Sequence, residues 1–257
     1  MKNNLPIGVF DSGLGGLTVV KELVKLLPNE NIVYLGDTAR VPYGTRSEEI
    51  VKKFSLEDAN FLLSKKVKCI VIACNTASAF AGDYLKGKLK IPVFDVITPT
   101  VNEANNTQQY GHIGVIGTRG TIKSGAYAVD YSVACPLLVP FIEEGEINSE
   151  ALETVIKNYL KDLKGNVNVL ILGCTHYPII EDLIQKEMGE EIELINPGKS
   201  VAREAKQFLS KNDLSNGQKT SGKKEYYVTD LTDRFVSVAE MFLGEEIKGK
   251  INRVSLD

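Results

Sequence analysis

The chain alternates short apolar runs with longer segments in which apolar residues recur every three or four positions. In the first hundred residues, four runs predict strands: IGVFD (7–11), NIVYLGD (31–37), CIVIAC (69–74) and IPVFDVI (91–97). The segments between them predict helices at 17–27, 47–66 and 76–89, with Ser47 placed to cap the second. Strands rich in Ile and Val that alternate with helices are typical of a parallel sheet covered on both faces. The predicted fold class is therefore α/β.

The same pattern starts again near residue 112. HIGVIG (112–117) repeats the opening strand and is followed by a turn and a helix, and PLLVPFIEEGE (136–146) corresponds roughly to the second strand with its irregular segment. A helix at 149–163, the run VLILGC (169–174) and the run EIELINP (191–197) complete the second half. Repetition on this scale predicts two similar domains related by a pseudo-twofold axis, rather than a solenoid.

The last fifty residues are expected to return to the first half. A polar, glycine-bearing stretch at 210–224 predicts a linker, and a strand at 225–230 and a helix at 233–244 follow it. We therefore expect a discontinuous first domain, 1–97 plus 208–257, and a second domain, 98–207.

Each half ends an equivalent strand with a cysteine. From Ile7 to Cys74 is 67 residues, and from Ile113 to Cys174 is 61. Ligands of open parallel sheets bind at the carboxyl ends of the strands, so both thiols are expected in a cleft between the domains. Two thiols that approach one ligand from opposite sides suit inversion at a carbon acid, because thiol and thiolate interconvert near neutral pH.

Composition and net charge exclude several classes of protein and favour one cellular location. With 43% apolar and 25% charged residues and a net charge of −3, the chain has no basic field for nucleic acid and no apolar stretch that would span a membrane. MKNNLPIGVF leads almost directly into a strand and leaves no room for a signal sequence, so a cytoplasmic protein with reduced cysteines is expected.

Four blocks in order make the chain resemble the glutamate racemases of bacterial cell-wall synthesis, in the aspartate/glutamate racemase superfamily. They are GVFDSGLGGLTV, YLGDTARVPYG, ACNTASA and LGCTHYP. The resemblance covers nearly the whole chain. It implies an isomerase that interconverts L- and D-glutamate without pyridoxal phosphate, metal or nucleotide, supplies D-glutamate for peptidoglycan, and forms a homodimer.

The resemblance also implies roles for individual residues. Cys74 is the base toward D-glutamate and Cys174 the base toward L-glutamate. Asp11 and His176 handle the protons of the two thiols, and a glutamate of the EEG sequence assists; Glu144 is our choice, with Glu143 left open. The expected substrate-binding residues are Asp11, Ser12, Tyr43, Gly44, Asn75, Thr76, Thr118, Thr121, Thr175 and His176.

Other interpretations stay open from the sequence alone. A strand-ending cysteine is more often an inert core residue, which is our expectation for Cys69 and Cys135. An aspartate racemase or another two-thiol isomerase fits the same blocks, whereas a one-thiol decarboxylase does not. A zinc protein using Cys69, Cys74, Cys174 and His176 fits ligand spacing badly. A non-catalytic protein that binds a small acid is the alternative of another class.

Overall fold

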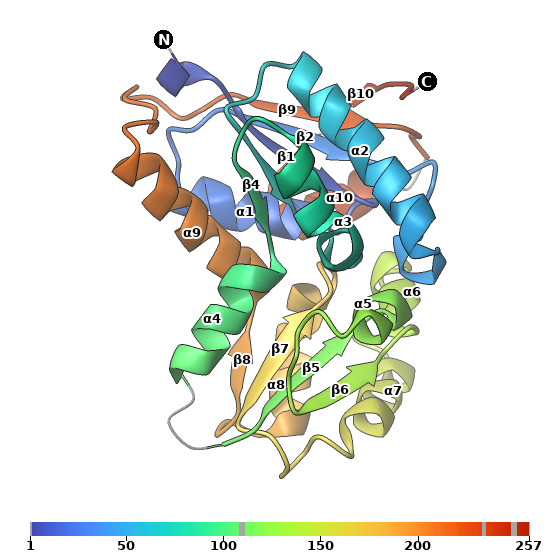
Figure 1. The fold of residues 1–257 in the computed structure, drawn as a ribbon. Helices are drawn as coiled ribbons and strands as arrows, with labels where there is room; N and C mark the ends of the chain where they lie inside the picture. The colour runs from blue at the N-terminus through green and yellow to red at the C-terminus, as the bar shows by residue number, and fades with distance from the viewer. Residues whose placement is uncertain (1, 108–110, 233–234, 248–250, 257) are drawn as a thin grey trace.

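The strands form two separate parallel sheets in the computed structural model, which describes residues 2–107, 111–232, 235–247 and 251–256 (Figure 1). The first sheet contains β1 (Ile7–Asp11), β2 (Ile32–Gly36), β3 (Cys69–Ile72), β4 (Val93–Asp95), β9 (Lys224–Val228) and β10 (Ile251–Arg253). The second contains β5 (Ile113–Gly117), β6 (Tyr131–Ala134), β7 (Val169–Gly173) and β8 (Glu193–Ile195). The α/β class with two parallel sheets is confirmed.

The two sheets repeat one strand order. The first runs β10-β9-β2-β1-β3-β4 and the second β6-β5-β7-β8, so β1, β2, β3 and β4 correspond to β5, β6, β7 and β8. The strand predicted at 225–230 pairs with β2, from Ile32 opposite Lys224 to Gly36 opposite Val228. The duplication predicted from the sequence is therefore present in the strand order.

Helices cover both faces of the first sheet (Figure 1). On one face, Ile7 and Val9 pack in a core that also takes residues from α1 (Leu17–Leu26), α9 (Pro197–Lys211) and α10 (Phe235–Leu243). On the other, Phe10 packs against α2 (Glu48–Ser64) and α3 (Asn75–Lys88). Alternate side chains of one strand thus enter different cores, which explains why Ile7, Val9 and Phe10 of β1 are all apolar.

The remaining helices lie in the second half or lead into it. They are α4 (Ile97–Thr107), which leads into it, α5 (Arg119–Ser124), α6 (Leu138–Glu143), α7 (Glu150–Leu160) and α8 (Glu181–Met188). Short 3₁₀ turns occur at Lys2–Asn4, Tyr43–Thr45 and Tyr177–Ile180. No helix of the described residues is both long enough and apolar enough to cross a membrane.

One predicted correspondence is wrong. The segment 136–146 does not supply a strand: β6 lies before it, and the segment itself contains α6. Leu138 and Ile142 are the buried residues of α6, and their spacing of four places them on one face of a helix. The edge strand β6 was hard to detect because none of its residues is fully buried.

Other predicted elements agree, with shifts at their ends. Ser47 caps α2 as expected, since its side chain accepts a hydrogen bond from the backbone N–H of Ile50. The sequence did not predict α4, α8, α9 or β10. The helix predicted at 233–244 is observed as α10 from Phe235, and its first two residues lie outside the described part.

Candidate active site

A cavity of about 260 Å³ lies where the carboxyl ends of the two sheets meet. Its lining residues follow β1, β2 and β3 in the first half and β5, β6 and β7 in the second, so equivalent loops of both halves contribute. The lining includes most of the residues that the sequence singled out: Ser12, Tyr43, Gly44, Cys74, Asn75, Thr76, Thr118, Cys174, Thr175 and His176. The two thiols predicted to meet in a cleft therefore do reach one cavity.

Cys74 lies at the start of α3. Its Sγ accepts a hydrogen bond from the backbone N–H of Ala77 at 3.4 Å, so the thiol caps the helix. The thiol also donates toward Ser12 Oγ at 3.4 Å. Burial, and then the nearby charge of Asp11, raise the pKa of Cys74 to about 12, although the contacts with Ser12 and Ala77 act in the opposite direction. Cys74 is therefore held as a thiol at neutral pH.

Asp11 ends β1 behind the cavity wall and is fully buried. Its Oδ2 accepts a hydrogen bond from the backbone N–H of Gly13 at 2.9 Å, while Oδ1 has no hydrogen-bond partner in the described part of the chain. Burial raises the pKa of this carboxyl, and the positive charge of His176 opposes that effect. Asp11 thus interacts electrostatically with Cys74 and His176 without lining the cavity.

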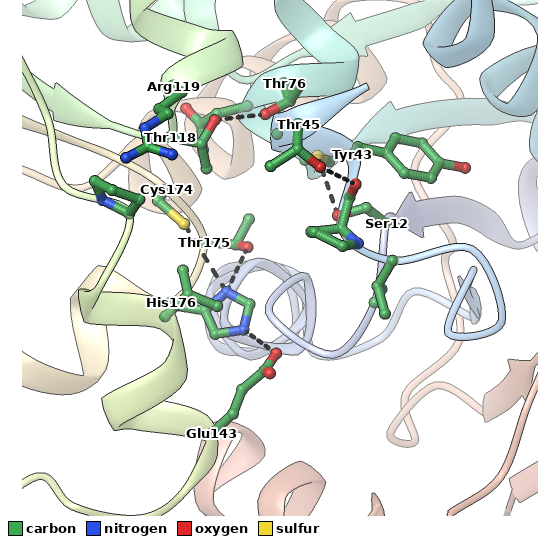
Figure 2. Close-up of a pocket in the computed structure, with 18 of the residues that line it drawn as sticks. Ser12, Tyr43, Thr45, Thr76, Thr118, Arg119, Glu143, Cys174, Thr175 and His176 are labelled. Atoms are coloured by element: carbon green, nitrogen blue, oxygen red, sulfur yellow. Dashed lines mark hydrogen bonds and ion pairs between the residues drawn. The ribbon is translucent and has the colours of Figure 1, made fainter. Parts of the chain in front are cut away.

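The second thiol belongs to a chain of polar contacts (Figure 2). Cys174 Sγ lies 3.9 Å from His176 Nδ1, and His176 Nε2 lies 2.9 Å from Glu143 Oε1. Burial alone would lower the pKa of His176, but its contacts with Cys174 and Glu143 outweigh burial and raise it to about 10. His176 is therefore an imidazolium at neutral pH, a state that stabilises a neighbouring thiolate.

The choice between the two glutamates falls on Glu143. Its carboxylate lines the cavity and contacts His176, whereas Glu144 is not among the described residues that line the cavity. Glu143 is the last residue of α6 and Glu144 follows as its C-cap. Successive helical residues point about 100° apart, so only one of the two can face His176. Of the two glutamates left open by the sequence, Glu143 is therefore the one placed to act on His176.

First-half elements enclose the His176 ring. Phe242 of α10 meets it edge to face, with ring centroids 5.1 Å apart and an interplanar angle of 85°. Gly15, in the loop before α1, lies so close that a Cβ there would come within 2.5 Å of His176 Nδ1. Thr18 also donates a hydrogen bond to the carbonyl of Thr175 at 2.8 Å. The His176 ring, which belongs to the second half, is thus oriented by residues of the first half.

Hydroxyl groups join the halves on the other side of the cavity. Thr76 Oγ1 lies 2.9 Å from Thr118 Oγ1 and 3.1 Å from Thr121 Oγ1, and the last two are 3.0 Å apart. Thr118 lines the cavity, whereas Thr121 is buried beneath it. This triangle gives the cavity a polar end suited to a carboxylate.

Tyr43 contributes differently from our expectation. Its hydroxyl is turned away from the cavity (Figure 2) and contacts two buried carboxylates, Asp37 Oδ2 at 2.5 Å and Asp58 Oδ2 at 2.9 Å. Arg40 forms ion pairs with both carboxylates. Tyr43 therefore supports the wall formed by 41–45 rather than offering its hydroxyl to a ligand.

The two cysteines also differ in their helical surroundings. The helix predicted at 76–89 is observed as α3, which begins at Asn75 directly after Cys74. Cys174 is followed instead by the 3₁₀ turn Tyr177–Ile180, and α8 begins only at Glu181. The helix dipole therefore acts on the first thiol, while the imidazolium of His176 acts on the second.

Several residues that line the cavity were not predicted from the sequence. They are Gly13, Val41, Pro42, Thr45, Arg119, Pro136, Val139 and Pro140. Arg119 is the one with charge, and its position directly after the turn that follows β5 was the available signal. An arginine here adds a cation to a cavity otherwise lined by neutral polar and apolar groups, thiols, His176 and Glu143.

The remaining cysteines lie away from the cavity. Cys69 begins β3, at the opposite end from Cys74, and Cys135 is fully buried after β6. All four cysteines are free thiols. Within the described ranges, no group of three or more His, Cys, Asp or Glu residues is arranged to hold a metal ion, and this includes the four residues of the zinc alternative.

Comparison with known proteins relates this arrangement to one family. The model of the family described as Asp/Glu/Hydantoin racemase matches residues 7–205. A glutamate racemase of Aquifex aeolicus is 48% identical, with 96% of this chain and 97% of that protein covered.

Two solved structures share the fold. A glutamate racemase of Thermus thermophilus in complex with beta-chloro-D-alanine has a TM-score of 0.92 at 41% identity, covering 99% of this chain and 98% of the other. A glutamate racemase of Francisella tularensis in complex with D-glutamate has a TM-score of 0.91 at 44% identity, covering 99% of both chains. Family model, sequence and fold agree over nearly the full length, and the chain belongs to the Asp/Glu/Hydantoin racemase family.

Proposed function

We propose that this chain interconverts L- and D-glutamate with Cys74 and Cys174 as the two acid/base groups. The observation that carries the proposal is one cavity that receives a thiol from the equivalent strand of each half. The reaction itself is that of the curated relatives, and the chain is accordingly an isomerase, an amino-acid racemase.

Each turnover moves two protons. From L-glutamate, the Cys174 thiolate takes the proton of Cα, and the electron pair of the broken C–H bond is left on Cα and its carboxylate. The Cys74 thiol then gives its proton to the opposite face, which forms the C–H bond of D-glutamate. The reverse direction exchanges the two roles, so no atom is lost from either substrate or enzyme.

The protonation states of Cys74 and His176 support these roles. A pKa of about 12 keeps Cys74 protonated and ready to donate, and a pKa of about 10 keeps His176 charged beside Cys174. A protonated Cys74 opposite a charged His176 suits the direction that starts from L-glutamate. We assign Asp11 to the proton of Cys74, and His176 with Glu143 to the proton of Cys174.

Substrate binding is assigned to the polar lining. Ser12, Asn75, Thr76, Thr118 and Thr175 offer donors to the two carboxylates, and the N-terminus of α3 favours an anionic group nearby. We propose that the domains, 1–97 with 208–257 and 98–207, close over the substrate. Closure excludes water and so strengthens the stabilisation of charge that develops at Cα.

The biological setting is proposed on the family resemblance. D-glutamate made here enters peptidoglycan, the enzyme acts in the cytoplasm as a homodimer, and catalysis needs no added cofactor. Light scattering of the purified protein measures the oligomeric state directly.

Circular dichroism at a fixed wavelength tests the function. The signal of pure L-glutamate should decay to zero without an added cofactor, and L-aspartate measured separately should not follow at a comparable rate. Cys74→Ser and Cys174→Ser should each abolish racemisation while the far-ultraviolet spectrum stays that of a folded protein. Decay of aspartate alone would change the substrate, and racemisation at the wild-type rate by either variant would rule out the two-thiol scheme.

A further inference from the structure

Tyr127 is a buried phenol that joins the two thiol loops without touching the cavity. It lies in the turn between α5 and β6, where Gly125, Ala126 and Ala128 are exposed and Tyr127 itself is 3% exposed. Its Oη donates a hydrogen bond to Asn75 Oδ1 at 2.5 Å, across the boundary between the halves. Asn75 directly follows Cys74 and lines the cavity, whereas the lining of that cavity does not include Tyr127.

The backbone conformation of the turn places the Tyr127 side chain in the interior. Gly125 has a φ of +67° and Ala128 a φ of +46°, so Tyr127 lies between two left-handed residues. A non-glycine residue in this conformation is uncommon and costs free energy, which must be offset by interactions elsewhere. The ring passes close to Gly173, where an added Cβ would lie 3.3 Å from Tyr127 Cε2. Tyr127 therefore packs beneath the residue before Cys174 while it holds the residue after Cys74.

The hydrogen bond fixes which way the Asn75 amide points. An amide has one accepting oxygen and one donating nitrogen on opposite sides. Burial raises the pKa of Tyr127 well above its ordinary value of 10, so the phenol keeps its proton and donates. The oxygen of Asn75 is then turned toward the protein, which leaves the nitrogen for the cavity.

We propose that Tyr127 is a positioning residue that orients the Asn75 amide so that its NH₂ group donates to a carboxylate of the substrate. The inference rests on the proposed function, because it needs a carboxylate substrate in this cavity. Without the phenol the amide is free to flip, and its oxygen would then repel the carboxylate.

Tyr127→Phe tests the inference, with Tyr226→Phe as its matched control. Tyr226 is 2% exposed, and its hydroxyl has no hydrogen-bond partner among the described residues, so the control removes an equally buried hydroxyl without breaking a bond. Loss of one neutral hydrogen bond predicts a rise in the KM for glutamate of about 3- to 10-fold in Tyr127→Phe, a smaller change in kcat, and no change in Tyr226→Phe. A wild-type KM in Tyr127→Phe would overturn the proposal.

Asn75→Asp distinguishes two roles of the Tyr127–Asn75 hydrogen bond: orienting the Asn75 amide, or only holding the two halves together. The aspartate still accepts from Tyr127 but has no NH₂ group, so we expect the melting temperature to be retained and the KM to rise by at least about tenfold. A wild-type KM in Asn75→Asp would mean that the bond only joins the halves.

A readout without turnover keeps this inference distinct from the racemase proposal. The side-chain NH₂ resonances of Asn75, followed by ¹⁵N NMR in the free protein, should shift in Tyr127→Phe and stay unchanged in Tyr226→Phe. Unchanged Asn75 resonances in Tyr127→Phe would overturn the inference whatever the enzyme does. A wild-type protein that fails to racemise glutamate would instead count against the proposed function.

Discussion

Replacing Glu143 by Gln should weaken the charged pair at the second thiol. The pKa of His176 is about 10, against 6.5 for a free imidazole. At about 1.4 kcal/mol per pKa unit, this difference corresponds to about 5 kcal/mol in favour of the imidazolium, shared among its contacts. Glu143 is one of those contacts, at 2.9 Å, and its side chain is 46% exposed. Solvent screening reduces its share, and we take about 1.4 kcal/mol for it.

The expected consequence is a shift in one proton equilibrium. Glu143 favours the imidazolium of His176 over the neutral imidazole, and the imidazolium stabilises a neighbouring thiolate. Losing about 1.4 kcal/mol weakens the stabilisation that the imidazolium gives to the attacking thiolate, so kcat should fall by up to about tenfold. Because the two enantiomers have equal free energy in water, kcat/KM must fall equally in both directions.

Circular dichroism measures the rate, and NMR titration measures the pKa of His176. The chain has two histidines, so a His112→Asn variant assigns the signals. The pKa was raised by Glu143, so the titration of His176 should move to lower pH, by about one unit, in Glu143→Gln. Glu144→Gln is the matched control. A wild-type rate and titration in Glu143→Gln, together with a loss in Glu144→Gln, would refute the reasoning.

Two further changes test the loop beside His176 and the start of α4. Gly15→Ala places a Cβ within 2.5 Å of His176 Nδ1, and the displaced imidazole should lower kcat about 10²-fold. Gly87→Ala is the control, because open space surrounds Gly87, and it should leave kcat unchanged. Equal rates in the two variants would contradict this expectation. Asp95 accepts hydrogen bonds from the backbone N–H groups of Ile97 and Thr98 at the start of α4 and pairs with Lys86. Burial alone would raise the pKa of Asp95, but these contacts lower it below 3.8. Its ionised form therefore stabilises the fold above about pH 3.8, and this contribution is lost as the pH falls through the lowered value. In urea unfolding, Asp95→Asn should cost about 1–3 kcal/mol at neutral pH and less in acid, and a cost independent of pH would argue against the ion pair.

Sequence reasoning worked best where strands are buried on both faces. β1, β3, β5 and β7 read as uninterrupted apolar runs because helices cover both sides of each sheet. The positions of Cys74 and Cys174 at the ends of such runs were enough to predict one shared cavity. The repetition of the two halves could be predicted because the central strands of both halves are such apolar runs.

The features that the sequence did not predict depend on the direction of side chains and on contacts between residues far apart in the chain. Glu143 and Glu144 are adjacent, and only the turn of α6 decides which faces His176. Phe242 reaches His176 from α10, far along the chain, so no local pattern announces it. α4 lacked a clear signal because its sequence ITPTVNEANNT is mostly polar and contains a proline. α9, by contrast, had an available signal, the Asn196 cap before Pro197.

The central claim is that two different groups exchange protons on the two faces of Cα, and racemisation in D₂O tests it most directly. Starting from L-glutamate at low conversion, ¹H NMR with separation of the enantiomers follows deuterium at Cα in product and in recovered substrate. The account predicts that D-glutamate carries solvent deuterium, because the Cys74 thiol exchanges with D₂O, while the remaining L-glutamate keeps its proton. D-glutamate that retains the original proton, or L-glutamate that exchanges as fast as it racemises, would contradict the two-thiol account.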